Sequence, residues 1–131
     1  MLNLEYKIGG LKINPNKLPF NGSDPYDASH HFVTRAVDSY VEIYVAEAET
    51  HFQVVNIFNL NEMKDNIAEG GSFYLNENNE LVLDDYSGDY DAISKKAAQS
   101  FAELILPEIE KLGVYVKRIV VDPNERRIND F

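Results

Sequence analysis

The stretch LDDYSGDYDA, residues 83–92, holds the densest set of potential metal ligands in the chain. Asp85, Ser87, Asp89 and Asp91 place a side-chain oxygen at every second position, a spacing typical of calcium-binding loops. An EF-hand loop also needs glycine at its sixth position and glutamate at its twelfth. Counted from Asp85, a glycine stands fourth and a lysine twelfth, so the stretch does not follow the EF-hand pattern.

Three histidines offer imidazole nitrogens, the second type of potential metal ligand in this chain. His30, His31 and His51 are the only histidines, and three imidazoles with one open position are a catalytic zinc arrangement. Adjacent residues of an extended chain point to opposite faces, so His30 and His31 are not expected to ligate one ion. No His-x-His or His-Glu-x-x-His pattern occurs. We therefore predict no metal and no cofactor.

Nucleophilic catalysis has a weak candidate in the loop at residues 27–31. Asp27, Ser29 and His30 supply the residue types of a catalytic triad, but nearness in sequence is not triad geometry, and no Gly-x-Ser-x-Gly elbow is present. The sequence thus favours a chain that is not an enzyme. A small enzyme that uses His51 or the 27–31 loop is the alternative.

Charge is the strongest functional signal. The chain carries a net charge of −10, and residues 38–91 contain thirteen acidic residues and a single basic one, Lys64. Such a field repels nucleic acid and anionic membranes and attracts basic surfaces. We predict a basic protein partner, no direct binding to nucleic acid and no binding to membranes. Solubility alone is the competing explanation of the charge.

Tyrosines lie among these acids, and tyrosine is enriched at protein interfaces. The predicted partner-binding residues are Glu77, Glu80, Asp84, Asp85, Tyr86, Asp89 and Tyr90. Within this set we expect Asp84, Asp85, Tyr86 and Tyr90 to be exposed. Asp89 or Asp91 is also expected to cap the helix that follows.

Length and composition indicate one domain, residues 1–131, with enough apolar residues to form a core. The chain has no cysteine, which fits a reducing compartment. Its start has no signal-peptide pattern, and no apolar run approaches the roughly 20 residues that span a bilayer. The expected location is the cytoplasm.

Apolar patterning predicts the secondary structure. Strands are expected at 2–13, 32–46, 51–58 and 114–122, with a hairpin over 72–85 that turns at Asn76–Asn79. A long loop is expected at 14–31 and a short helix near 60–69.

The best-defined element is an amphipathic helix at about 91–112, whose apolar residues recur at steps of three and four. Pro107 is expected to kink it or split off its last turn, and Gly113 to cap it. The predicted fold class is α+β: a mostly antiparallel sheet with the long helix packed on one face.

The function expected from this reasoning is a non-catalytic, inhibitory protein-binding module of the immunity-protein or phage anti-defence type. Its acidic, tyrosine-bearing surface would meet a basic partner such as a nuclease or a toxin. Besides the enzyme, the alternative is a subunit of a self-assembling complex, for instance a phage structural protein or another homo-oligomer.

Overall fold

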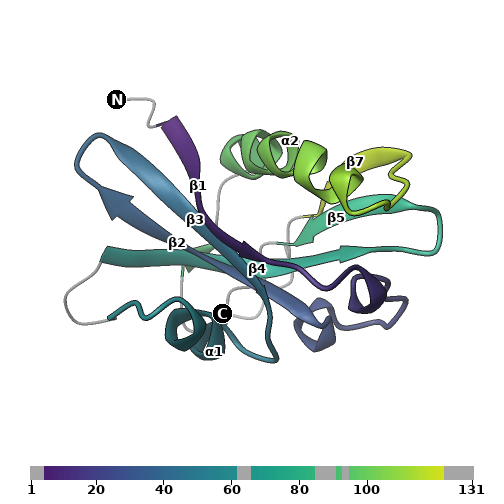
Figure 1. Ribbon diagram of the computed structural model, residues 1–131, viewed down its shortest axis with the longest axis horizontal. Coiled ribbons are helices and arrows are strands. Elements are labelled where there is room, and N and C mark those ends of the chain that lie inside the picture. Colours follow the sequence, from purple (N-terminus) through teal and green to yellow (C-terminus); the bar gives the residue numbers. More distant parts are fainter. Residues whose placement is uncertain (1–4, 62–65, 85–90, 93–94, 123–131) are drawn as a thin grey trace, which may run out of the picture.

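A computed structural model describes residues 5–61, 66–84, 91–92 and 95–122. These residues fold as α+β, as predicted, and form one large sheet and two α-helices (Figure 1). The elements, in order, are β1 Glu5–Lys12, η1 Pro15–Lys17, η2 Pro25–Asp27, β2 His30–Val37, β3 Tyr40–Glu47, α1 His51–Ile57, β4 Asn66–Leu75, β5 Glu80–Asp84, β6 Asp91–Ala92, α2 Lys95–Lys111 and β7 Arg118–Asp122. No helix in these ranges is long and apolar enough to cross a membrane.

The sheet is mixed, not mostly antiparallel. Its strands follow the order β1-β3-β2-β4-β5-β7, with β6 paired to β4 beside this path. The central pairs β3–β2, β2–β4 and β4–β5 are antiparallel. The outer pairs β1–β3 and β5–β7 are parallel, and so is β4–β6. The prediction is therefore correct for the centre and wrong for the edges, because β1 and β7 reach their partners through long crossover connections.

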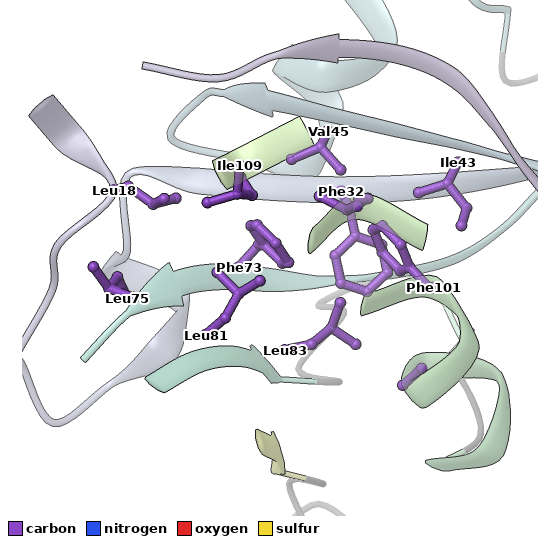
Figure 2. Close-up of a cluster of buried hydrophobic side chains, with 12 residues drawn as sticks. Leu18, Phe32, Ile43, Val45, Phe73, Leu75, Leu81, Leu83, Phe101 and Ile109 are labelled. Carbon is purple, nitrogen blue, oxygen red and sulfur yellow. The ribbon is translucent and has the colours of Figure 1, made fainter. Parts of the chain in front are cut away.

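The larger core brings buried residues of α2 together with residues of the central strands (Figure 2). The Phe101 ring lies edge-on to Phe32, with centroids 4.9 Å apart, and stacks on Phe73 at 6.1 Å. Ile105 and Ile109 continue the buried stripe at helical spacing. The apolar periodicity that predicts the helix is the one that fills this core.

A second core gathers Val33, Tyr44 and Ala46 of the sheet with Val54 and Val55 of α1. In β2, Val33 alternates with Phe32 of the first core, so the two clusters occupy opposite faces of the sheet. Figure 1 shows α1 and α2 on opposite sides of the strands.

The predicted strand at 51–58 is wrong, because these residues form α1. The Thr50 hydroxyl accepts a hydrogen bond from the Gln53 amide at 3.1 Å, and the Gln53 side chain accepts one from the Glu49 amide at 2.7 Å. These reciprocal bonds resemble a capping box and begin a helix. The β-branched residues Val54 and Val55 therefore lie in a helix, where they are buried in the second core.

The predicted short helix near 60–69 is also wrong where it can be compared. Residues 66–69 belong to β4, and residues 62–65 lie outside the described ranges. Residues 51–57 and 66–69 are therefore assigned to the wrong elements, and the short strand β6 between β5 and α2 was not predicted.

The long helix is shorter than expected, since α2 begins at Lys95, and Asp91 and Ala92 form β6. Asp91 is therefore a strand residue and not the helix cap. The helix continues through Pro107 to Lys111, so its last turn is not split off. Gly113 has φ +84° and its amide bonds the Glu110 carbonyl, which confirms the predicted left-handed cap.

The predicted strand at 32–46 is a hairpin, β2 and β3, that turns at Asp38 with φ +35°. The hairpin at 72–85 is confirmed: β4 and β5 pair antiparallel, and Asn79 has φ +59° in the turn. Asparagine and aspartate tolerate this left-handed conformation better than most residues.

Candidate functional site

The structure places the predicted partner-binding residues in different environments. Asp84, at the end of β5, is only 3% exposed, so the expectation that it faces solvent is wrong. Glu77 is exposed in the β4–β5 turn. Asp85, Tyr86, Asp89 and Tyr90 lie outside the described residues.

Glu80 is committed to a contact within the chain. Its side chain accepts a hydrogen bond from Asn76 Nδ2 at 2.8 Å and forms an ion pair with Arg118 of β7. These bonds, the Asn76 bond first, hold the pKa of Glu80 below its usual range. Glu80 is 8% exposed, so it ties β5 to β7 and offers little surface to a partner.

All three histidines are buried, although His30 and His31 fall within the stretch that was predicted to be a long loop. His30 and His31 are neighbours in β2 and lie opposite Phe73 and Ser72 of β4. The strand pleat therefore sends the two rings to opposite faces, as predicted.

His30 has one satisfied nitrogen. Its Nε2 accepts from the Asn14 amide at 3.0 Å, so in the neutral ring the proton sits on Nδ1. That Nδ1 has no hydrogen-bond partner among the described residues. Burial lowers the pKa of His30 to about 4 despite the nearby charge of Glu47, so His30 is neutral at pH 7.

His31 and His51 come together on the other face. Their ring centroids lie 4.9 Å apart, and the Tyr26 ring lies 5.2 Å from His31 and 5.6 Å from His51. His51 Nε2 donates to the Gly71 carbonyl at 3.1 Å, and burial lowers the pKa of His51 to about 4. This cluster, Tyr26, His31 and His51, is the one that sequence reasoning missed, because it took 51–58 as a strand.

Both nitrogens of His31 face carbonyl oxygens. Nδ1 lies 2.6 Å from the Ala48 oxygen and Nε2 lies 2.8 Å from the Tyr26 oxygen. Burial lowers the pKa of His31, while the two carbonyls and the charge of Asp27 work against that shift. Each nitrogen of this ring is therefore directed at a backbone oxygen, whichever of the two carries the proton.

Ser72 stands directly opposite His31, and Asp84 directly opposite Ser72. These are the residue types of a triad, and all three are buried. The Ser72 hydroxyl, however, makes no hydrogen bond to any described residue. A nucleophile and its base must be within hydrogen-bond reach, so the arrangement lacks the first requirement of this chemistry.

An open pocket of ≈ 730 Å³ lies beside the histidine cluster. We call it the acidic pocket; it is lined by Lys17, Tyr26, Asp27, Ala28, Ser29, Glu47, Ala48, Glu49, Thr50 and Gln53. Three carboxylates thus face one ammonium group. Glu47 accepts a hydrogen bond from Asn14, whereas Asp27 and Glu49 make no side-chain hydrogen bond or ion pair within the described part of the chain.

The loop residues weighed for catalysis separate in the structure. Asp27 and Ser29 line the acidic pocket, while His30 is buried among other residues. In the described ranges, no group of three histidine, aspartate or glutamate side chains is placed to hold a metal ion.

No protein-family model, curated protein or solved structure matches this chain.

Proposed function

We propose that the chain is a non-catalytic protein-binding module of inhibitory or immunity type whose acidic surface meets a basic partner. The observation that carries the proposal is the charge of the acidic pocket. Among the described residues, neither Asp27 nor Glu49 forms an ion pair with a lysine or arginine side chain, so these carboxylates can pair with such a side chain from a partner. A net charge of −10 also speeds encounter with a basic target such as a nuclease or a toxin.

The proposal moves the predicted contact from 84–90 to the acidic pocket. Glu77, which is exposed and lies outside the pocket, is kept as a second partner-binding residue. Asp84 and Glu80 are buried and are not included. The proposal also takes α2 as the cover of one sheet face, which leaves the pocket, on the side of α1, open to a partner. The absence of cysteine supports a cytoplasmic setting.

Affinity capture from a cell extract at low salt, followed by a salt titration of the purified complex, tests this function. The test variant is Asp27→Asn, Glu47→Gln, Glu49→Gln. The matched control, Glu5→Gln, Glu103→Gln, Glu110→Gln, removes three exposed acids elsewhere. We expect the pocket variant to weaken binding by at least about tenfold and the control by far less, since specific pairs matter more than net charge. Equal losses, or a complex unchanged at about 1 M salt, contradict the proposal.

Self-assembly is the second candidate, and the sheet edges favour it. β1 and β7 end the strand order, and an edge strand offers backbone groups for pairing with another chain. Size-exclusion chromatography with light scattering distinguishes a monomer from a ring or dimer. The enzyme alternative is less well supported, since the nitrogens of His31 already face carbonyl oxygens.

A further inference from the structure

The His31 side chain joins two segments that are far apart in sequence. Its Nε2 contacts the carbonyl of Tyr26 in η2, and its Nδ1 contacts the carbonyl of Ala48 between β3 and α1. Tyr26 and Ala48 both line the acidic pocket. The His31 side chain itself is fully buried.

The number of protons on the ring decides how many of these contacts are favourable. A carbonyl oxygen only accepts, so each contact needs an N–H from the ring. A neutral imidazole has one N–H and an imidazolium has two. The observed distances of 2.6 and 2.8 Å thus suit the imidazolium, while the neutral ring sets a lone pair against one of the two oxygens.

The surroundings divide into groups that favour the charged ring and groups that oppose it. From η2, the negative charge of Asp27 acts on His31, and the Tyr26 ring packs against it in a T-shaped arrangement. From α1, the His51 ring packs against His31 in a T-shaped arrangement, and the two imidazoles disfavour protonation of one another. The cross-strand partners, Ala46 of β3 and Ser72 of β4, are uncharged, and the buried Asp84 lies one strand beyond Ser72.

We propose that His31 is a proton-operated latch between the η2 turn and the backbone at Ala48. With two protons the ring bonds both carbonyls and holds the two segments together. With one proton it keeps the Ala48 bond, which is shorter and more buried, and releases the Tyr26 carbonyl. Acidification therefore closes the latch on one wall of the acidic pocket. The latch goes beyond the proposed function, because it depends on the His31 contacts alone and holds whether or not a partner binds.

Nuclear magnetic resonance on the isotope-labelled full chain tests the latch. Long-range proton–nitrogen spectra report the protonation of each imidazole, and hydrogen exchange reports the η2 turn through the amides of Asp27 and Ala28, which bond the carbonyls of Asp24 and Pro25. As the pH falls, we expect His31 to pass from a single N–H on Nδ1 to two. The protection factors of the two amides, corrected for intrinsic exchange, should rise about tenfold at the same midpoint, the effect of one charge-assisted hydrogen bond.

Three results would overturn the latch. The first is a His31 that stays neutral until the chain unfolds, because the closed form then never exists. The second is a proton on Nε2 alone in the neutral ring. The third is a turn whose protection follows the titration of His30 or His51. The test can be decided with the unmodified chain alone. His31→Gln, which has no imidazole to protonate, should abolish the rise in amide protection. His30→Gln, on the other face of the sheet, should leave that rise unchanged.

Discussion

His31 and His51 meet edge to face in the interior, with ring centroids 4.9 Å apart, although one belongs to β2 and the other begins α1. His51 also bonds the Gly71 carbonyl of β4. His51 therefore connects the first turn of α1 to two neighbouring strands, β2 and β4. Buried imidazoles at this position make the stability of the fold sensitive to pH.

Acid should destabilise the protein well above the range in which carboxyl groups titrate. The pKa values of His30 and His51 are about 4 in the folded chain against an ordinary 6.5, and that of His31 is lowered as well. The unfolded chain therefore binds more protons, so stability is complete above pH 6.5 and is lost as the pH falls towards 4. His30 and His51 each account for up to ~3 kcal/mol. Urea unfolding at pH 7 and at pH 5 measures the loss, and equal free energies of unfolding would contradict it.

Gly71→Ala should be among the most disruptive single changes in the sheet. A Cβ there would lie 2.2 Å from the backbone oxygen of Asp84 and 2.4 Å from the Phe32 ring, and neither can move away. We expect a loss of at least about 3 kcal/mol. Gly113→Ala is the control, because it meets no atom within 4 Å and pays only for its positive φ, about 1 kcal/mol. Chemical denaturation of both variants checks the difference, and similar losses would refute the steric explanation.

Thr50→Ala should remove the N-cap of α1. The hydroxyl accepts the Gln53 amide at 3.1 Å, and its loss leaves that amide to water. We expect a cost of about 1 kcal/mol. Ser100→Ala in α2 removes an exposed hydroxyl that bonds only a carbonyl of its own helix, and should change stability by less than about 0.5 kcal/mol. The two thermal transitions can be compared directly, and an unaffected Thr50→Ala would argue against the cap.

Phe101→Ala should open the larger core. The ring is fully buried and contacts both Phe32 and Phe73, so truncation leaves a cavity that β2 and β4 cannot fill (Figure 2). The expected loss is about 3–5 kcal/mol. Tyr115→Ala, at a ring that is 67% exposed, serves as the matched aromatic truncation and should cost little. Guanidinium unfolding of the pair provides the measurement, and comparable losses would mean that the Phe101 contacts contribute little.

The histidine cluster depends on α1, which the sequence analysis predicts as a strand. The signal for α1 was present in the sequence, since Thr50 and Gln53 stand at capping-box spacing. The run of β-branched and aromatic residues that follows favours a strand and outweighed it. A strand at 51–58 would not bring His51 to His31, whereas the first turn of α1 does.

The sequence by itself determined the elements whose pattern is local and repeated. The stripe through Phe101, Ile105 and Ile109 indicates a helix, the asparagines between two apolar runs indicate a hairpin, and the alternation of a strand separates His30 from His31. Tertiary structure alone decided the parallel edges of the sheet, the burial of Asp84 and the contact of His31 with Tyr26, Ala48 and His51. These features depend on which distant segments of the chain pack together. The packing is set by the burial of apolar surface over the whole chain, so a short stretch of sequence cannot predict it.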